Sequence, residues 1–291
     1  MTTLMLGEAL VDLVCDEPVA RLADAPSFAP RFGGTVARTA VAAASRGARV
    51  ALAGGVGDDE WGGWLRERLE EERVDLTWFR QVAGERTPVA FRTTDPAGDA
   101  HVDLYDQSLD LVMDAVRPRI AEAVDACDGV YVSAATWALA DDSRERQVAA
   151  GALRRARDQG RSIVVALDVA PDRFVTREAA RDAADALVTG AALVIARPAD
   201  AQRVTGTADP AAAAQVLVDR GAALAAVGDH HGAVVRGSGV GTAVAGAGPD
   251  ARGPGDDAAF AGALLAALEL SGWYPAAVAA GLADAVAAAA G

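Results

Sequence analysis

Short apolar runs alternate along the chain with longer segments in which apolar residues recur every three or four positions. Runs of the first kind are typical of buried strands, and the second spacing is typical of amphipathic helices. The runs predict strands at residues 4–6 and 9–14, which Gly7 bends or interrupts, and at 49–53, 129–132, 163–167, 193–195 and 222–227. The periodic segments predict helices at residues 36–45, 61–73, 143–159, 177–188, 210–219 and 257–271.

The order of these elements indicates the fold class. Strands and helices that alternate in this way form an α/β protein with a mostly parallel sheet covered by helices on both faces. Gly54, Gly55 and Gly57 predict a turn after one strand. Residues 88–104 depart from the alternation, because two strand-like runs flank a turn sequence at 95–98 and predict a hairpin that forms a small flap. No internal repeat or long linker divides the 291 residues, so we expect one principal domain.

The amino-acid composition limits which kinds of partner and nucleotide-binding motif the protein can have. Hydrophobic residues make up 52% of the chain, which is enough for a large core. The formal net charge of −14 repels a phosphate backbone, so nucleic acid is a poor partner. The chain contains no lysine, which excludes the G-x-x-x-x-G-K-[ST] phosphate loop.

Cysteine usage and the first residues bear on the cellular compartment. Cys15 and Cys127 are too far apart in the sequence to suggest a zinc site or a disulfide framework, so we expect free thiols in a reducing compartment. Glu8 and Asp12 interrupt the first apolar run, and no basic region precedes it, which argues against a signal peptide. No segment indicates a membrane span. We therefore expect a cytoplasmic protein without a membrane partner.

Candidate chemistry is concentrated in residues 250–257, immediately before the last long predicted helix. Gly253 and Gly255 allow backbone N–H groups to converge on an anion at the helix N-terminus. The carboxylate of Asp256 could take a proton from a hydroxyl that attacks a phosphoryl group. An ordinary Gly-Pro turn, in which an aspartate caps the helix, is the alternative interpretation.

Residues 250–257 resemble the D-T-x-G-A-G-D signature of the PfkB-type, ribokinase-like carbohydrate kinases, and other sequence features of that family occur in the same order. Residues 7–12 are similar to its first strand. Gly33 and Gly34, before an Ala-rich helix, are similar to its first signature, G-G-x-x-x-N-x-A. Residues 55–62 are similar to its V-G-x-D-x-x-G run. The resemblance covers nearly the whole chain and is greatest to the fructokinase-like branch.

The resemblance implies a ribokinase-like α/β fold, with one domain at 1–291 and a small β lid formed by segments near 13–31 and 88–106. It also implies a carbohydrate kinase, in which ATP with Mg²⁺ donates the γ-phosphoryl group to a hydroxyl of a fructose-like ketose or related sugar. Asp256 would be the catalytic base. The other implied positions are the anion hole at Gly253, Pro254 and Gly255, the substrate positions Asp12, Gly33, Gly34, Arg38, Asp168 and Arg173, and the nucleotide positions Arg197, Asp200, Gly228, Gly232 and Asp250.

The chain departs from the family signatures at several of these positions. Arg38 replaces the asparagine of the first signature; its charge would favour an acidic or phosphorylated substrate, unless the side chain points to solvent. Arg197 and Asp200 replace the two polar residues of the N-x-x-E motif, either to neutralise phosphate or as a plain surface ion pair. Pro254 removes one N–H donor from the anion hole. Asp257 leaves the register open, and we take Asp256 as the base.

These departures leave other functions open. The protein could be a non-catalytic sugar or nucleotide binder on a kinase scaffold, or a nucleoside kinase in which Phe32 or Trp137 lies beside the base. A metal site at His230 and His231 is disfavoured, because adjacent side chains rarely reach one ion. An exposed edge of the hairpin at 88–104 would suit a homodimer formed through the lid.

Overall fold

Two β-sheets organise the protein. The computed structural model describes residues 1–96, 100–105, 109–169, 171, 173–237, 239–246 and 256–290. The large sheet consists of β1 (Thr3–Leu6), β4 (Val50–Gly57), β5 (Phe79–Val82), β8 (Gly129–Ser133), β9 (Ser162–Ala166), β10 (Leu193–Ala196), β11 (Leu224–Asp229), β12 (Gly232–Gly237) and β13 (Gly241–Gly246). The small sheet consists of β2 (Leu10–Val14), β3 (Ala29–Gly33), β6 (Val89–Thr94) and β7 (Ala100–Tyr105).

The large sheet has the strand order β13-β12-β11-β10-β9-β8-β1-β4-β5. Every neighbouring pair from β11 to β5 is parallel, and β12 and β13 extend the sheet antiparallel at one edge. In the centre, Leu4 of β1 lies opposite Val130 of β8 on one side and Ala51 of β4 on the other. This mostly parallel sheet confirms the predicted fold class.

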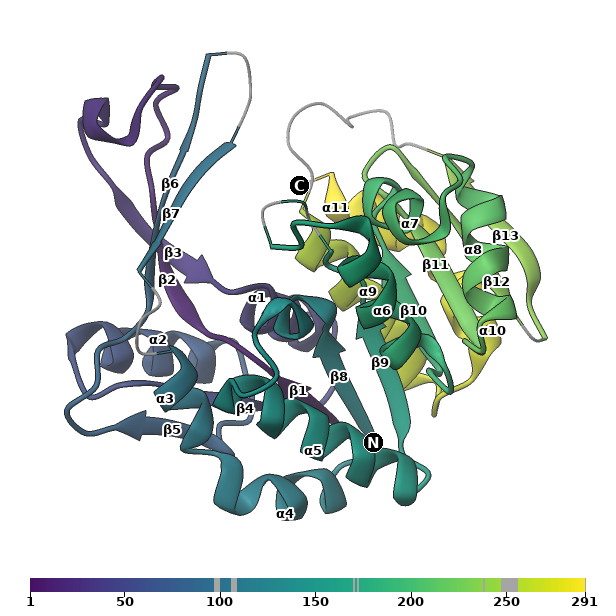
Figure 1. Ribbon diagram of the computed structural model, residues 1–291, viewed down its shortest axis with the longest axis horizontal. Coiled ribbons are helices and arrows are strands. Elements are labelled where there is room, and N and C mark those ends of the chain that lie inside the picture. Colours follow the sequence, from purple (N-terminus) through teal and green to yellow (C-terminus); the bar gives the residue numbers. More distant parts are fainter. Residues whose placement is uncertain are drawn as a thin grey trace.

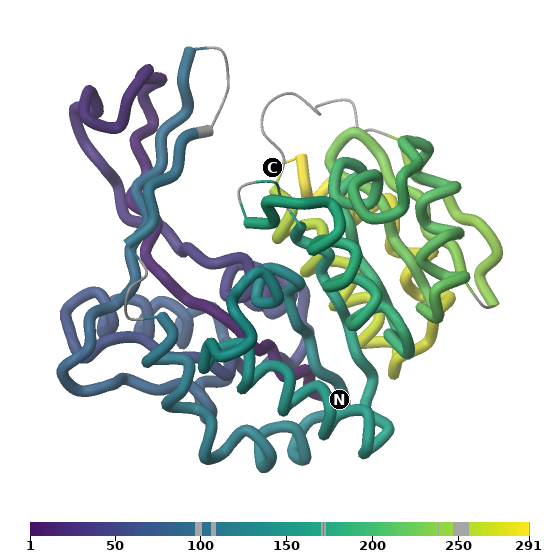
Figure 2. Tube along the Cα trace, in the orientation of Figure 1, coloured from purple at the N-terminus to yellow at the C-terminus, as the bar shows by residue number. Residues whose placement is uncertain are grey.

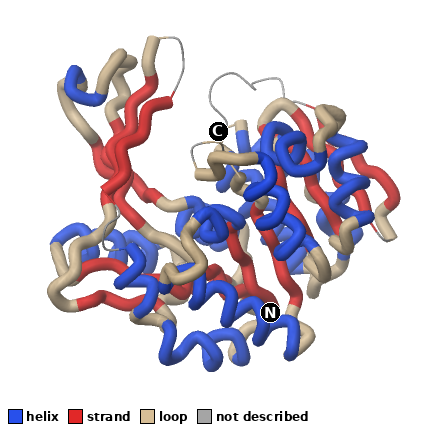
Figure 3. The backbone as a smooth tube through the Cα atoms, viewed as in Figure 1, coloured by secondary structure: helices blue, strands red, loops and turns tan. Residues whose placement is uncertain are grey.

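Helices cover both faces of the large sheet, as Figures 1 and 3 show. The core on one face includes residues of α3 (Leu109–Asp114), α4 (Ile120–Asp125), α5 (Arg144–Asp158), α6 (Arg177–Val188), α7 (Pro198–Thr205) and α8 (Pro210–Asp219). The core on the other face includes residues of α1 (Thr35–Ala44), α2 (Glu60–Glu71), α9 (Asp257–Leu270), α10 (Pro275–Ala280) and α11 (Leu282–Ala289).

Strand β1 illustrates how one sequence supplies both cores. Successive side chains of a strand point to opposite faces of the sheet. Leu4 and Leu6 accordingly belong to the core beneath α5 and α6, and Met5 belongs to the core beneath α1 and α9. All of them are buried, so a continuous apolar run is needed here, whereas a half-exposed strand would alternate apolar and polar residues.

Polar side chains fix the starts of several predicted helices. Ser143 accepts a hydrogen bond from the backbone N–H of Arg146 and caps α5. Thr176 caps α6 in the same way through Ala179 N. A cap of this kind satisfies an N–H group that has no partner inside the helix. The predicted starts of these two helices are therefore confirmed to within a residue.

The prediction of a turn at Gly54, Gly55 and Gly57 is wrong, because these residues belong to β4. The glycines are needed there for close backbone packing. A Cβ atom on Gly54 would lie 2.5 Å from the carbonyl oxygen of Gly7, and one on Gly55 would lie 2.4 Å from that of Val112. The glycine run thus marks a strand that neighbouring backbone approaches closely.

The hairpin predicted at residues 88–104 is confirmed as the antiparallel pair β6 and β7. Strand β2 follows β1 in the chain but leaves the large sheet and pairs with β3 and β6 instead. Figure 1 shows the resulting small sheet projecting away from the large sheet on the side where α2 and β5 lie. The arrangement as one domain with a lid stays a prediction.

Two further sequence predictions concern cysteines and membranes. Cys15 and Cys127 are both buried and free, as expected. Among the described residues, no helix has the length and apolar character needed to cross a membrane.

Candidate active site

Arg38 and Asp256 form an ion pair between α1 and the start of α9. The Nη2 atom of Arg38 donates a hydrogen bond to Oδ1 of Asp256 at 2.7 Å. The same Oδ1 atom accepts hydrogen bonds from the backbone N–H groups of Ala258 and Ala259, so Asp256 is the N-cap of α9. The predicted alternative, in which Arg38 points to solvent from a surface helix, is wrong. The cap interpretation of Asp256 is confirmed, and it orients the carboxylate that we predicted to be the base.

Close packing of two helices brings these residues together from opposite ends of the sequence. Gly262 of α9 lies so near α1 that a Cβ atom there would be 2.6 Å from Cβ of Ala42. Figure 2 shows the two helices side by side. Arg38 lies one helical turn before Ala42, and Asp256 lies before the first turn of α9. Both helix N-termini therefore meet at the ion pair, and their dipoles add positive potential there.

Arg197 connects three carboxylates, of which Asp168 follows β9, Asp200 lies in α7 and Asp257 begins α9. Arg197 follows β10 directly, and its Nε lies 2.6 Å from Oδ2 of Asp200. Its Nη1 lies 3.5 Å from Asp257 Oδ2, and its Nη2 lies 3.7 Å from Asp168 Oδ1. Burial raises the pKa of Asp200 and of Asp257, and the charge of Arg197 offsets part of each rise. The prediction of a plain surface ion pair is wrong, because Asp200 is only 3% exposed.

Asp12 lies on β2 and is almost completely buried. Arg92 of β6 places its Nε 2.9 Å from Asp12 Oδ2, an ion pair without hydrogen-bond geometry. Asp12 Oδ1 finds no hydrogen-bond donor among the described residues. Burial raises the pKa of Asp12, and first Arg92 and then Arg38 lower it in part. Arg38 therefore acts electrostatically on Asp12 while it binds Asp256.

Gly33 and Gly34 leave room for the groups around Asp12 and the start of α1. A Cβ atom on Gly33 would lie 2.8 Å from the Asp12 carboxyl group. Gly34 has φ = +84°, a conformation that favours glycine, and a Cβ atom there would lie 2.6 Å from the carbonyl oxygen of Glu8. The carboxylate of Glu8 accepts a hydrogen bond from Thr35 N at 2.8 Å. The structure thus places both glycines beside Asp12 and Glu8.

Arg173 is near two buried glutamates that the sequence analysis did not select. Glu8 and Glu145 are 8% and 4% exposed. Burial raises the pKa of both, to about 8 for Glu145, and the charge of Arg173 opposes the rise in each. Glu8 follows the central strand β1 after one glycine, and that position at a strand's carboxyl end is a signal that could have identified it.

The predicted nucleotide positions Gly228 and Gly232 lie near the end of β11 and at the start of β12, on either side of the turn that joins these strands. Because Val227 pairs with Ala196 of β10, Gly228 lies next to Arg197 across the sheet. His230 and His231 stack in this turn with ring centroids 3.8 Å apart. The described residues include no group of His, Cys, Asp or Glu side chains that could hold a metal ion.

Four predicted site residues, Gly253, Pro254, Gly255 and Asp250, lie outside the described residues. Among those that are described, Arg38 binds Asp256 and lowers the pKa of Asp12 through its charge, and Arg197 connects Asp257 with Asp168 and Asp200. The missed residue with the most direct contact is Arg92, which pairs with Asp12. Its place on the predicted hairpin gave no sign of this, because the pairing of β6 with β2 is not encoded locally.

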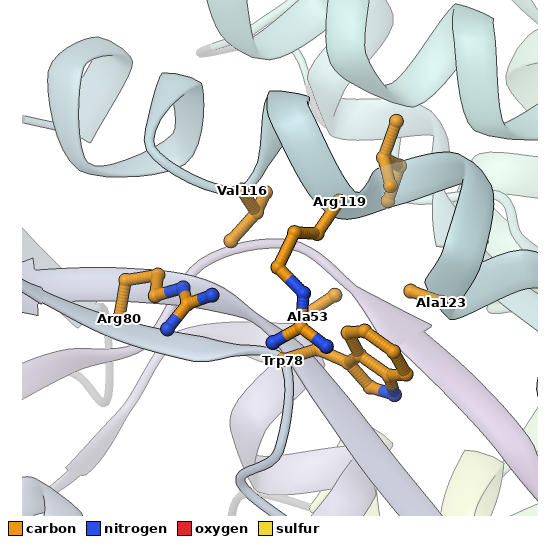
Figure 4. Close-up of a pocket in the computed structure, with 7 residues that line it drawn as sticks. Ala53, Trp78, Arg80, Val116, Arg119 and Ala123 are labelled. Carbon is orange, nitrogen blue, oxygen red and sulfur yellow. The ribbon is translucent and has the colours of Figure 1, made fainter.

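A pocket of about 360 Å³ lies next to Arg173, outside the carboxylate clusters. Trp137, Leu139, Phe174 and Val175 contribute apolar walls. A second hollow, shown in Figure 4, lies between β5 and the segment around α4. There Arg119 stacks on the ring of Trp78 at 4.4 Å, and none of the predicted site residues lines the hollow. Of the two, the pocket beside Arg173 is the better candidate for a ligand.

Comparison with known proteins identifies relatives in sequence and in structure. Probable fructokinase-4 of Arabidopsis thaliana is 36% identical over 99 residues, which are 34% of this chain and 30% of that protein. The 5-dehydro-2-deoxygluconokinase of Photobacterium profundum is 29% identical over 173 residues, which are 59% of this chain and 51% of that protein. The chain thus spans about a third to a half of the length of these curated relatives.

Solved structures resemble the chain over nearly its whole length. A PfkB protein from Polaromonas sp. JS666 has a TM-score of 0.82 and 24% identity, and the match covers 100% of this chain and 95% of that one. A putative ribokinase II from E. coli in complex with ATP and Mg²⁺ has a TM-score of 0.84 and 17% identity, covering 99% and 91%. These likenesses establish the ribokinase-like fold. The sequence profile described as pfkB family carbohydrate kinase matches residues 2–290, and the chain therefore belongs to that family.

Proposed function

We propose that this protein is an ATP-dependent kinase that transfers the γ-phosphoryl group to a hydroxyl of a sugar, with a fructose-like ketose as the first candidate. The observation that carries the proposal is the position of Asp256. Its Oδ1 is held by two backbone N–H groups of α9 and by Arg38, whereas Oδ2 takes no part in these hydrogen bonds. A carboxylate fixed through one oxygen presents the other to a substrate in a defined orientation.

In the proposed reaction, the sugar hydroxyl oxygen forms a bond to the γ-phosphorus of ATP while the bond from that phosphorus to the β–γ bridging oxygen breaks. The hydroxyl proton passes to Oδ2 of Asp256, and ADP leaves. Phosphoryl transfer depends mainly on positioning and on electrostatic stabilisation of the transferred group. The two helix N-termini at the Arg38–Asp256 pair supply positive potential for that purpose.

Asp12 supports the proposed sugar side of the site. A buried carboxylate oxygen without a donor is unfavourable unless a ligand supplies one. Asp12 Oδ1 is such an atom, and sugar hydroxyls are suitable donors. The small sheet that carries Asp12 and Arg92 would act as the lid in this proposal, because Asp12 would bind the sugar from it.

The described residues do not fit a divalent cation bound by the protein itself. The three carboxylates of Asp168, Asp200 and Asp257 are engaged by Arg197, and no other candidate metal group occurs in the described part of the chain. Mg²⁺ therefore enters the proposal as part of the nucleotide substrate. We propose that ATP approaches Arg197 and the ends of β11 and β12 at Gly228 and Gly232.

The test is a measurement of ADP release from ATP and Mg²⁺ with purified protein and a panel of ketoses, aldoses, sugar acids and nucleosides. We expect turnover with at least one sugar. Folded protein that releases no ADP with any of them would contradict the proposal. Sugar binding without ATP binding, measured by calorimetry, would instead indicate the non-catalytic binder.

A nucleoside kinase is the second candidate, and the pocket beside Arg173 favours it. Trp137, Phe174 and Val175 form apolar walls that suit a flat base. Phe32, the other aromatic residue predicted for this role, is near Trp64 instead, with ring centroids 6.1 Å apart. Replacement of Trp137 by alanine should raise the KM for a nucleoside and leave the KM for a sugar unchanged.

A further inference from the structure

Arg38 occupies a position beside the proposed proton acceptor in which its charge remains accessible. The side chains of Arg38 and Asp256 are 34% and 45% exposed. Half-exposed ion pairs contribute little to stability, so a ligand can share or replace the contact at small cost. One N–H group is sufficient for the bond to Asp256, and the remaining donors of the guanidinium fork can bind a second acceptor.

The chemistry of this position has changed from that of the family signature. Asparagine both donates and accepts hydrogen bonds, whereas arginine only donates and carries a fixed charge. The chain contains no asparagine anywhere, so no neighbouring asparagine can take over the role. A hydroxyl that needs an acceptor at this point loses its partner, and an anion gains one.

The two sides of the site make different demands on one ligand. Asp12 Oδ1 is a buried acceptor without a donor, which a hydroxyl satisfies. Arg38 donates to Oδ1 of Asp256 and has further N–H donors, and an anionic oxygen satisfies these better than a neutral one does. Arg92 already offsets the charge of Asp12, so Arg38 is not needed for that purpose. A sugar that carries both hydroxyls and an anionic group meets both demands.

We propose that Arg38 makes the site selective for a negatively charged sugar, whose carboxylate or phosphate binds the guanidinium while a neighbouring hydroxyl faces Asp256. The catalytic part of this inference rests on the proposed kinase function. The preference for an anionic ligand is also expected in binding without ATP. With a net charge of −14, the protein as a whole repels such a ligand, so recognition must come from a local cation. Arg38 is that cation.

The experiment compares matched ligand pairs with the wild type, Arg38→Asn and Arg38→Lys. Glucuronate against glucose tests the carboxylate, and fructose 6-phosphate against fructose tests the phosphate. Binding is measured by calorimetry in the absence of ATP, and ADP release is measured in parallel. Arg46→Asn is the control, because it makes the same change at an exposed position just beyond the C-terminal end of α1.

For the wild type we expect at least one anionic ligand to bind about 10- to 100-fold more tightly than its neutral partner, as for a charge-assisted contact. Arg38→Asn should lose this preference, Arg38→Lys should keep part of it, and Arg46→Asn should keep all of it. Added salt should weaken binding of the anion in the proteins that carry a positive charge at position 38 and should have little effect in Arg38→Asn.

Equal binding of charged and neutral ligands by the wild type would overturn the inference, even if the protein phosphorylates neutral sugars. An Arg38→Asn variant that loses binding of both ligands equally would also overturn it, because Arg38 would then only hold Asp256 in place. Selective binding of the anion through Arg38 without ADP release would support the inference and contradict the kinase function.

Discussion

The guanidinium of Arg197 lies 3.5 Å from the carboxylate of Asp257 and so joins the end of β10 to the first turn of α9. The same group contacts Asp168 and Asp200, which makes it the centre of a cluster with more negative than positive charge. Burial and the neighbouring charges act in opposite directions on the pKa of Arg197, and the carboxylates, Asp200 first, raise it overall. The charge of Arg197 therefore favours the ionised forms of Asp200 and Asp257, against the effect of their burial.

Arg197→Asn should destabilise the protein and make its stability depend on divalent cations. Asp200 is buried and would lose its charged partner, which should lower the free energy of unfolding by about 1–3 kcal/mol. Because Mg²⁺ prefers carboxylate oxygens, the carboxylates of Asp168, Asp200 and Asp257 should then bind it in place of the lost guanidinium. Thermal unfolding with MgCl₂ and with NaCl at equal ionic strength measures the effect, and Mg²⁺ should raise the Tm of the variant more than that of the wild type.

The control for Arg197 is Arg21→Asn, which removes an exposed ion pair with Asp24. Its stability should change little, because both side chains of this pair are exposed to solvent. If Arg197→Asn were equally neutral, or if Mg²⁺ affected it no more than the wild type, the guanidinium would not be compensating these carboxylates.

Asp256→Asn should separate catalysis from folding. Asparagine is as good a helix cap as aspartate, so α9 should keep its start and the Tm should change little. The amide cannot accept the hydroxyl proton, and kcat for ADP release should fall by about 10²- to 10⁴-fold. Asp257→Asn should retain most of the activity, because its carboxylate is paired with Arg197. The opposite ranking of the two variants would transfer the role of base to Asp257.

Much of the fold could be predicted because its signals are local. Apolar runs and capping residues such as Ser143 and Thr176 determine where elements start, whatever lies around them. The glycines of β4 were misread, since their role depends on backbone that arrives from Gly7 and from residue 112. Only the assembled structure shows such close approaches.

The sequence identified several residues of the candidate site but did not show which of them contact one another. Arg38, Asp256 and Arg197 were selected from their places in family signatures, and the structure brings each to a carboxylate or an arginine. The pairing of Arg38 with a residue 218 positions away could not be read from either segment. It depends on the packing of α1 against α9 at Gly262, a contact between two unremarkable small residues in the sequence.

Gly33→Ala should disturb the Asp12 side of the site. Its Cβ atom would lie 2.2 Å from Cδ1 of Leu10 and 2.8 Å from the Asp12 carboxyl group, so one of these side chains must move. We expect a loss of about 1–3 kcal/mol in the free energy of unfolding, measured with urea, and a higher KM for the sugar. Gly63→Ala is the matched control, because it lies within α2 and its Cβ atom would meet nothing within 4 Å.

Gly63→Ala should stabilise the protein by about 0.5–1 kcal/mol, since alanine loses less backbone entropy than glycine in a helix. If Gly33→Ala behaved like Gly63→Ala, with unchanged KM, then Gly33 would not be shaping the space around Asp12.

Glu145→Gln should remove a specific pH dependence of stability. Burial is the main reason that the pKa of Glu145 is raised from 4.5 to about 8, and the charges of Glu8 and Asp110 raise it further. The hydrogen bond from Thr136 and the charge of Arg173 lower it in part. Between these two values the folded state holds a proton that the unfolded state has lost. As pH rises between these values, Glu145 therefore lowers the free energy of unfolding of the wild type by up to about 1.4 kcal/mol per pH unit. Above pH 8 its contribution no longer changes with pH.

Glutamine is neutral at every pH, so the variant lacks this contribution while other groups titrate as before. The difference in free energy of unfolding, variant minus wild type, should grow with pH up to about 8 and then remain constant. Urea unfolding of both proteins at pH values between about 5 and 9 measures it. A difference that does not change with pH would mean that Glu145 ionises at its ordinary pKa in the folded protein. In that case the positive charge of Arg173 would be sufficient to keep this buried carboxylate ionised.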